Sequence, residues 1–234
     1  MRSMSEQGWR DALSNTGWLS KVSGEFRDAL LSVCSWRTYQ SGQWLYIAGD
    51  RGGGIFGVAD GELGITTILG PPNSPHLHVG SAGFWTGEAP LIANKPRIAS
   101  AIAVTDTVVA YAPLLKLQTL LGAKPEWWQH IAQLSLETTL LAAGAWADLM
   151  IHDARRRCVA VLLRLAGRRV SDQDHEGNGG VNVSQDMLAA MSNLSRSTVH
   201  ATLSELAARN LVDVGFRSIR VLDANALRAL VNAE

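Results

Sequence analysis

Six polar side chains between residues 185 and 200 are of the types that bind DNA. They are Gln185, Ser195, Arg196, Ser197, Thr198 and His200. A guanidinium can donate two parallel hydrogen bonds to a guanine base, and amide, hydroxyl and imidazole groups can bond to phosphate oxygens or base edges. Arg196, Ser197, His200 and Ser204 have the spacing of one polar helix face. The sequence therefore predicts a surface that contacts DNA in this region.

Residues 182–210 predict the elements that would position these side chains, namely two short helices joined by a tight turn. Apolar residues recur at helical spacing on both sides of the turn, at Leu188 and Met191 before it and at Val199, Leu203 and Leu206 after it. Ser184 and Ser195 are suitable N-caps, and Asp186 places a negative charge in the first turn of its helix. This pattern is that of a helix-turn-helix, whose second helix enters the major groove of DNA. A helical hairpin with a solvated face is the alternative.

A β-hairpin is predicted directly after the second helix. Residues 212–214 and 219–222 are β-rich runs around Gly215, Phe216, Arg217 and Ser218. Such a hairpin would form the wing of a winged helix-turn-helix. Charge adds little, because residues 152–234 hold 11 arginines and no lysine against 9 acidic residues. The prediction of DNA binding therefore depends on the motif.

The order of residues 183–227 resembles the DNA-binding domain of the Crp/Fnr family of bacterial transcription regulators. The run SRSTV at residues 195–199 matches the SRETV pattern that begins the recognition helix of that family, and the resemblance extends more weakly over nearly the whole chain. It implies an α+β fold in three parts. These are an N-terminal antiparallel, jelly-roll-like β-roll with N-terminal helices over residues 1–123, a long dimerisation helix over residues 124–151 and a C-terminal winged helix-turn-helix over residues 152–234.

The patterns of the N-terminal half agree with this implication. Residues 3–33 read as helix, and residues 34–112 contain short β-rich runs separated by glycine turns, which predicts a small antiparallel sandwich or barrel. After Pro125, residues recur near helical spacing at Trp128, Ile131, Leu134, Thr138, Leu141, Ala145 and Leu149. A helix this apolar needs a partner along its length. The resemblance implies a homodimer through residues 126–151, and packing on its own β domain alone is the alternative.

The resemblance also assigns base reading. In the family, the arginine after the starting serine, the glutamate after that and a second arginine four residues later read bases. This sequence keeps Arg196 but has Ser197 and Ala201 at the other two positions. We expect Arg196 to specify a guanine in each half-site of an operator that differs from the best-known consensus of the family. RNA polymerase is the further partner that the resemblance implies.

Residues 87–99 have the outline of the phosphate-binding cassette of the same family. In its cyclic-nucleotide binders, a glutamate holds the ribose hydroxyl, and an arginine with a following serine or threonine holds the cyclic phosphate. The resemblance thus assigns an effector site to Gly87, Glu88, Arg97, Ile98 and Ala99. Ile98 has no hydroxyl, so the sequence predicts weak or absent binding of cyclic AMP. An ion pair of Glu88 with Arg97 that fixes the cassette is the alternative, and it leads to a regulator without an effector.

Metal or haem ligands are scarce. His76 and His78 would put two imidazoles on one face of a strand, which is a spacing that suits a metal or haem. No further ligand is apparent nearby, so we expect loop-edge histidines and no cofactor. Cys34 and Cys158 cannot supply the four thiolates of an iron–sulfur cluster, and their separation predicts no disulfide framework.

Composition indicates a folded protein of neutral charge. The chain has 47% hydrophobic and 18% charged residues and a formal net charge of +0. Its start has no basic segment followed by an apolar core, and no run is long enough to span a membrane, so we expect a cytoplasmic protein. Trp85, Trp127 and Trp128 could line an effector pocket or fill the core, and the core is favoured. Catalytic motifs are absent, so we predict no enzyme, although a ligand-regulated enzyme or scaffold built from these modules is an alternative.

Overall fold

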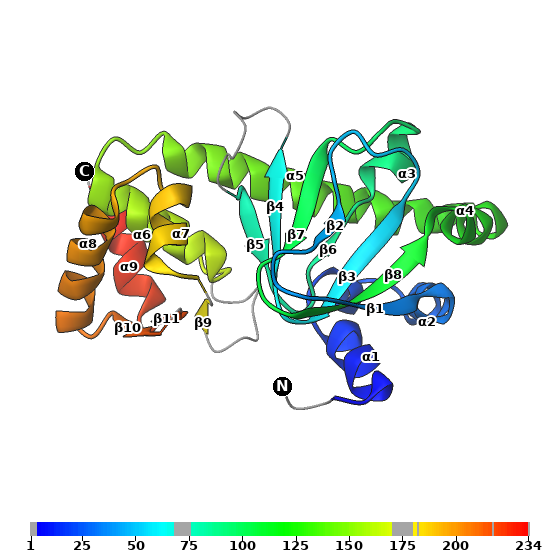
Figure 1. Cartoon of the computed structure of the whole chain (residues 1–234), viewed down its shortest axis with the longest axis horizontal. Helices are drawn as coiled ribbons and strands as arrows, with labels where there is room; N and C mark the ends of the chain where they lie inside the picture. Colours follow the sequence, from blue (N-terminus) through cyan, green and yellow to red (C-terminus); the bar gives the residue numbers. More distant parts are fainter. Residues whose placement is uncertain (1–3, 68–75, 170–179, 182, 217, 234) are drawn as a thin grey trace. The chain divides into compact units, whose positions relative to one another are not determined.

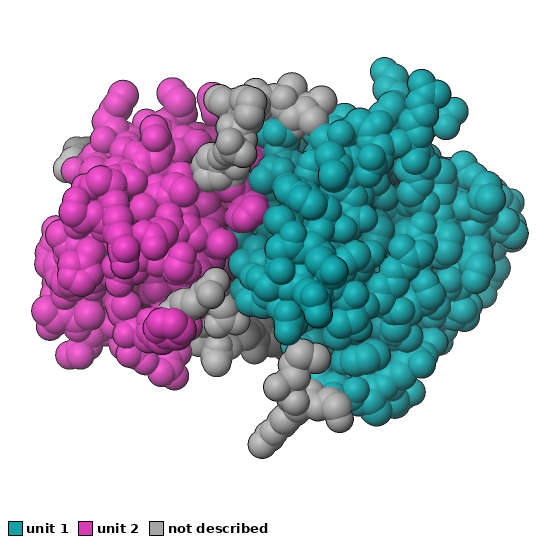
Figure 2. Space-filling view, viewed as in Figure 1, with its two compact units in different colours: residues 1–74, 78–140 teal, residues 75–77, 141–234 magenta. Residues whose placement is uncertain are grey.

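The structure is a computed structural model that describes residues 4–67, 76–169, 180–181, 183–216 and 218–233. The chain forms two compact units (Figures 1 and 2). Unit 1 contains Met1–Ser74 and His78–Leu140, and unit 2 contains Pro75–Leu77 and Leu141–Glu234. No helix among the described residues is long and apolar enough to cross a membrane.

Unit 1 contains two four-stranded antiparallel sheets (Figure 1). One has the order β1-β8-β3-β6, with β1 (Ser35–Tyr39), β8 (Thr107–Pro113), β3 (Gly54–Asp60) and β6 (Trp85–Thr86). The other has the order β2-β7-β4-β5, with β2 (Trp44–Tyr46), β7 (Ala99–Ala103), β4 (Leu63–Thr67) and β5 (His78–Gly80). The predicted antiparallel β sandwich is confirmed.

Helices precede and follow these sheets. The predicted N-terminal helix is divided into α1 (Glu6–Asn15), the 3-10 turn η1 (Trp18–Lys21) and α2 (Gly24–Val33). Ser5 and Ser23 cap α1 and α2 through hydrogen bonds from Gly8 N and Phe26 N. Two further helices were not predicted, α3 (Ala89–Ala93) and α4 (Leu114–Ala123). The 3-10 turn η2 (Pro125–Trp127) then leads into α5 (Trp128–Leu149), which begins and ends within two residues of the predicted dimerisation segment 126–151.

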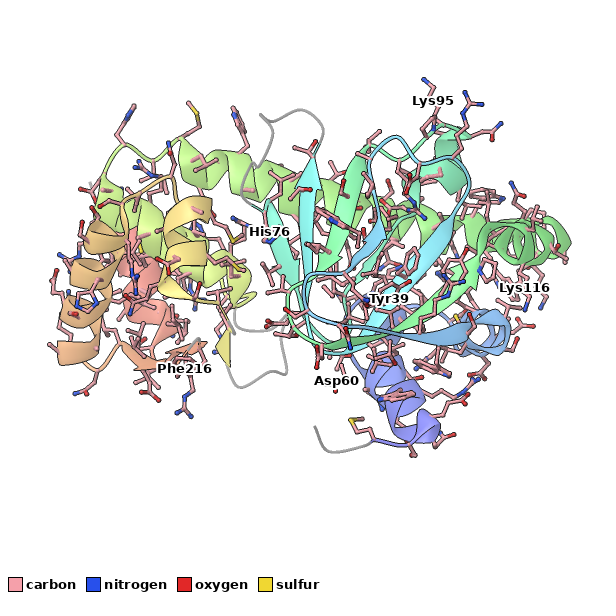
Figure 3. All side chains as sticks on the ribbon, viewed as in Figure 1. Tyr39, Asp60, His76, Lys95, Lys116 and Phe216 are labelled. Atoms are coloured by element: carbon pink, nitrogen blue, oxygen red, sulfur yellow. The ribbon has the colours of Figure 1, made fainter. Side chains whose placement is uncertain are left out.

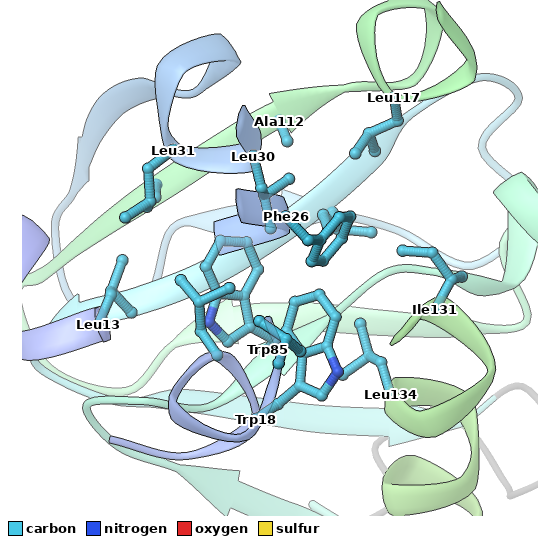
Figure 4. Close-up of a cluster of buried hydrophobic side chains, with 14 of the residues drawn as sticks. Leu13, Trp18, Phe26, Leu30, Leu31, Trp85, Ala112, Leu117, Ile131 and Leu134 are labelled. Atoms are coloured by element: carbon cyan, nitrogen blue, oxygen red, sulfur yellow. The ribbon is translucent and has the colours of Figure 1, made fainter. Parts of the chain in front are cut away.

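Unit 1 has two apolar layers because β3 and β8 are covered on both faces. Phe56 and Val58 of β3 face the second sheet, where they pack with Leu63 and Val109. The alternate residues of β3 face the helices, in a larger cluster that includes Leu13, Trp18, Phe26, Leu30, Trp85, Leu117, Ile131 and Leu134 (Figure 4). The period of two in a strand puts neighbouring side chains on opposite faces, so one strand supplies both layers.

The Trp85 side chain packs so close to the adjacent strand β3 that one position of that strand must be glycine. Its ring contacts Trp18 edge-on at a centroid distance of 5.5 Å, and the Trp18 indole nitrogen donates a 2.9 Å hydrogen bond to His130 O. A Cβ atom at Gly57 would lie 2.3 Å from the Trp85 ring. The close approach of this ring to β3 therefore requires glycine at residue 57. Trp85 and Trp127 are core residues, as favoured above, whereas Trp128 is 39% exposed.

Unit 2 is organised around α6 (Ala154–Leu165), whose residues from Cys158 to Arg164 are all buried. A helix that is buried on every side must be covered all round. Its neighbours are α7 (Gln185–Met191), α8 (Arg196–Ala208) and α9 (Ala224–Asn232). A three-stranded antiparallel sheet completes the unit, with β9 (Gly180–Val181), β10 (Val212–Gly215) and β11 (Ser218–Val221) in the order β10-β11-β9. The predicted helix-turn-helix and wing are confirmed, whereas α9 and β9 were not predicted.

Candidate nucleic-acid interface and sensor site

Two N-caps and one turn residue determine where the two helices of the helix-turn-helix begin and where the chain turns between them. Ser184 Oγ accepts a hydrogen bond from Met187 N at 3.1 Å, and Ser195 Oγ accepts one from Thr198 N at 3.2 Å. These bonds satisfy N–H groups that have no partner at a helix start. Asn193 has φ of 51°, in the left-handed region that asparagine tolerates, and so reverses the chain between α7 and α8.

Burial orients the second helix of this motif. Val199, Leu203 and Leu206 are at most 1% exposed, so one face of α8 is fully buried within unit 2. Arg196, Ser197 and His200 are exposed. The side chains with hydrogen-bonding capacity thus lie on the outward face of α8, where a DNA groove could receive them.

Two polar contacts link α7 to this outward face of α8. Arg196 Nε lies 3.2 Å from Asp186 Oδ1, and both side chains are well exposed. His200 Nδ1 lies 3.2 Å from Gln185 Oε1. The sequence-predicted residues Gln185, Arg196 and His200 are therefore brought together on one surface. Asp186 belongs to the same surface, although the sequence indicated only a role at the helix start.

Three hydroxyls at the start of α8 form a cluster. Ser195 Oγ lies 2.9 Å from Ser197 Oγ and 2.8 Å from Thr198 Oγ1. Ser195 and Ser197 are exposed and Thr198 is half-buried. A hydroxyl can donate one hydrogen bond and accept two, so the exposed members of the cluster keep capacity for a phosphate oxygen.

The wing hairpin pairs Gly215 with Ser218, which leaves a two-residue tip. Phe216 at this tip is 95% exposed (Figure 3), and Arg217 lies outside the described residues. Arg220 Nη2 and Asp213 Oδ2 form an exposed ion pair of 2.6 Å across the hairpin. The wing therefore presents charged and aromatic side chains beside α8.

A buried charge cluster joins the end of α5 to α6 inside unit 2. The Asp148 carboxylate lies 2.9 Å from Arg164 Nε and 3.1 Å from Arg169 Nε. Arg164 also donates from Nη1 to Leu77 O at 3.1 Å. Two guanidiniums share one carboxylate, so the last turns of α5 are held to α6 by charge as well as by packing.

Glu88 of the predicted effector site lies at the start of α3 and is 6% exposed. Its Oε1 accepts a 2.8 Å hydrogen bond from Thr138 Oγ1 of α5. Burial raises the pKa of Glu88, and the hydrogen bond from Thr138 opposes this rise. Thr138 was predicted only as part of the helical stripe, because sequence spacing gives no information on its contact with Glu88.

Arg97 is 4% exposed, and its guanidinium is bound by the β-roll itself. Nη2 donates to Gly54 O at 3.0 Å and Nη1 to Gly87 O at 3.4 Å. The guanidinium carbon lies 3.8 Å from the centre of the Tyr46 ring, which is a cation–π contact. Burial lowers the pKa of Arg97. Arg97 and Glu88 thus have separate partners, in place of the direct ion pair considered above.

The remaining predicted effector residues do not add a phosphate ligand. Ile98 is 61% exposed, so its side chain lies outside the β-roll instead of placing carbon beside a bound phosphate. Ala99 begins β7 and pairs with Thr67. Gly87 has φ of 97°, and a Cβ atom there would lie 2.9 Å from Arg97 Nη1. Ile98 thus offers no hydroxyl to a cyclic phosphate, and two of the five N–H donors of Arg97 already have carbonyl partners.

His76 and His78 do not lie together on one strand. His78 begins β5 and packs beside the Phe84 ring at 5.2 Å, whereas His76 precedes the strand and belongs to unit 2 (Figure 3). Within the described residues, no three His, Cys, Asp or Glu side chains gather to hold a metal.

Two protein-family models match this chain. The cyclic nucleotide-binding domain matches residues 36–124, and the Crp-like helix-turn-helix domain matches residues 156–230. The chain is 29% identical over 206 residues to the cyclic AMP receptor protein of Thermus thermophilus, which is 87% of this chain and 91% of that protein. The matching segments include the sensor residues and the α7–α8 surface described above.

Solved structures share the architecture. FixK2 from Bradyrhizobium japonicum has a TM-score of 0.72 at 18% identity, over 86% of this chain and 99% of that one. A transcriptional regulator of the CRP/FNR family from Thermus thermophilus has a TM-score of 0.61 at 24% identity, over 85% of this chain and 99% of that one. At these identities the likeness concerns the fold, and it confirms the predicted α+β class.

Proposed function

This chain belongs to the Crp/Fnr family of transcription regulators, and we propose that it binds a near-palindromic DNA operator as a homodimer. Residues 1–123 would act as the sensor, residues 124–151 as the dimerisation helix and residues 152–234 as the DNA-binding domain. The observation that carries the proposal is the exposed polar face of α8, with Arg196 at its start and a buried apolar face opposite. A twofold dimer would present two such helices to half-sites about one helical turn apart.

In this proposal, Arg196 reads the base. A bidentate arginine–guanine contact discriminates by about 1–3 kcal/mol against other bases. Ser197 and Ala201 offer less selective contacts, so the operator should differ from one read by three charged side chains. Gln185, Ser195, Thr198 and His200 would bind phosphates or neighbouring base edges and fix the position of α8 on the duplex.

Selection of binding sites from random DNA tests this assignment. The unaltered protein should return a near-palindrome with a defined guanine in each half-site. Arg196→Ala should lose the preference at that base pair alone, with the dimer intact. An unchanged motif for Arg196→Ala would place base reading elsewhere in the protein.

An apolar face of α5 supports the dimer. Leu136, Leu140, Trp146 and Met150 are 58%, 61%, 67% and 59% exposed. With the exposed Ala143 between them, Leu136, Ala143 and Met150 repeat every seven residues, which is the spacing of a coiled-coil seam. A second copy of the same helix is the partner that such a self-complementary seam fits.

Several residues of the apolar stripe read from the sequence lie on other sides of α5. Ile131, Leu134 and Ala145 of the expected stripe are buried inside their own units, and Leu141 is half-buried. The helix is apolar on more than one side, and we propose that its exposed face pairs with the second copy. Leu136→Asp and Leu140→Asp should therefore weaken the dimer, and sedimentation at micromolar concentration measures this. A monomeric unaltered protein would contradict the proposal.

The contacts of Arg97 limit which effector the β-roll could bind. Two of the five N–H donors of Arg97 are bound to Gly54 O and Gly87 O, which leaves fewer donors for a phosphate, and Ile98 adds no hydroxyl. We therefore propose that cyclic AMP binds weakly or not at all, and that the chain acts with another effector or with none. Calorimetry that gave a micromolar dissociation constant, lost in Arg97→Ala, would contradict this.

One of the solved structures named above is a transcriptional regulator of the CRP/FNR family, and we propose for this chain a regulatory role without enzymatic activity. RNA polymerase is the partner we propose at promoters, and the cytoplasm is the proposed location, since a regulator of this kind acts where bacterial DNA is transcribed. Co-purification of polymerase subunits with the DNA-bound protein, compared with protein alone, tests the first of these statements.

A further inference from the structure

Asp186 lies beside the arginine that is proposed to read DNA. Its Oδ1 is 3.2 Å from Arg196 Nε, and the two side chains are 65% and 72% exposed. Asp186 belongs to the first turn of α7 and Arg196 begins α8, so the pair bridges both helices of the motif. We propose that Asp186 is a positioning residue that orients the Arg196 guanidinium for contact with a guanine. This inference rests on the proposed function, in which Arg196 is the reader.

The shape of the guanidinium gives the reason. It is planar and carries five N–H donors, one on Nε and two on each terminal nitrogen. Asp186 occupies the Nε side, which leaves the donors of the terminal nitrogens for O6 and N7 of a guanine. A carboxylate on α7 therefore sets the plane of a side chain that would otherwise rotate about four bonds. Such preorganisation lowers the conformational entropy lost on binding.

The charge of Asp186 predicts a second effect, of opposite sign. DNA binding without sequence preference depends on neutralised phosphates, and a carboxylate at the interface opposes it. Asp186 should thus weaken binding to every duplex while it strengthens the preference for the correct base. An exposed ion pair contributes little to folding, so a purely structural role of Asp186 would produce neither effect.

A set of substitutions separates these effects. Asp186→Ala removes the carboxylate, and Asp186→Asn keeps a neutral acceptor for Arg196 Nε. Asp213→Ala is the matched control, because Asp213 is also exposed, also pairs with an arginine and changes the net charge equally. Circular dichroism and sedimentation verify that each variant folds and dimerises as the unaltered chain does.

The measured quantity is a ratio of affinities. Each variant is titrated with two duplexes. The first is the operator selected by the unaltered protein. The second is the same operator with one guanine replaced by adenine, namely the guanine for which Arg196→Ala loses the preference. Arg196→Ala should reduce the ratio about 5- to 150-fold. Asp186→Ala should reduce it by about twofold or more, which is the lower end of coupling between contacting side chains. The ratio for Asp186→Asn should lie between those of Asp186→Ala and the unaltered chain. Asp213→Ala should have the same ratio as the unaltered chain.

Affinity for a duplex of random sequence gives the independent readout. It should rise in Asp186→Ala, with a steeper dependence on salt, because Arg196 is then free to bind phosphate. In the Arg196→Ala background, Asp186→Ala should change the base preference no further. A ratio for Asp186→Ala equal to that of Asp213→Ala would overturn the positioning role while leaving Arg196 as the reader. An unchanged preference in Arg196→Ala itself would overturn the reader, and with it any role for Asp186 in orienting it.

Discussion

Replacement of Asp148 by alanine should destabilise unit 2 by about 3–5 kcal/mol, which is the usual effect of removing one member of a buried ion pair. The Asp148 side chain is 2% exposed and that of Arg164 is 6% exposed, with 2.9 Å between Oδ2 and Nε. Arg164 would then keep its charge at a largely buried site without a carboxylate partner. Arg169 is 29% exposed, so water can solvate its guanidinium and its share of the effect is small.

A second substitution tests whether the stranded charge is the cause. Arg164→Met in the Asp148→Ala background removes the buried guanidinium and keeps much of its apolar volume. Replacement of a whole buried ion pair by apolar groups is often neutral or stabilising, so the double variant should recover at least about 2 kcal/mol. Asp213→Ala is the control, since an exposed pair is worth about 0–1 kcal/mol.

Urea denaturation supplies the measurement, with labelling of the Cys158 thiol as the probe. Cys158 is 0% exposed in α6, so its reaction with a thiol reagent reports the opening of unit 2. The midpoint should shift to lower urea at an unchanged slope. A midpoint for Asp148→Ala equal to that of Asp213→Ala would refute the reasoning. Failure of Arg164→Met to restore stability would show that another loss, such as the anchoring of α5, causes the effect.

Three further outcomes are expected. Burial raises the pKa of Glu88, so its protonated form stabilises the fold below the ordinary carboxyl pKa, and this contribution is lost as pH rises through the raised value. Glu88→Gln keeps an acceptor for Thr138 and does not ionise. Between the ordinary and the raised pKa of Glu88, this variant should therefore become more stable relative to the unaltered chain as pH rises. Urea titrations at several pH values measure the difference. Burial raises the pKa of Cys158 to about 12, so iodoacetamide at pH 8 should modify it only after urea is added, as read by mass spectrometry. Gly57→Ala should lower the stability by about 1–3 kcal/mol, because the new Cβ overlaps the Trp85 ring, and a thermal scan would measure this.

The helix-turn-helix was predictable from sequence because its determinants are local. The caps at Ser184 and Ser195 and the apolar repeat through Val199 and Leu203 lie within a few residues of what they determine. The strands of the β-roll were also recognisable from their β-rich runs and glycine turns. Their order was not, because β1 pairs with β8, which joins Ser35 to Tyr111. Pairing over such a separation depends on packing of the whole unit.

The contacts of the sensor residues could not be predicted from sequence, for a second reason. Sequence placed Glu88 and Arg97 in one cassette, and both are buried near the start of α3 and β7. The partners that decide their chemistry are carbonyl groups and Thr138, and a backbone carbonyl gives no signal in residue types. The dimer face of α5 is a different case, since apolar residues occupy several sides of the helix and a repeat cannot choose among them.

The environment of Arg97 has a consequence for engineers who would convert this β-roll into a biosensor. Introducing a serine at residue 98 would place its hydroxyl in solvent, because that side chain points outward. The more direct route begins at Gly53, where an added Cβ atom would lie 2.3 Å from Arg97 Nη2 and would force the guanidinium to move. Gly53 has φ of 133°, so a side chain there also strains the backbone. A library that varies residue 53 together with the loop around it is therefore the practical starting point for installing a new ligand.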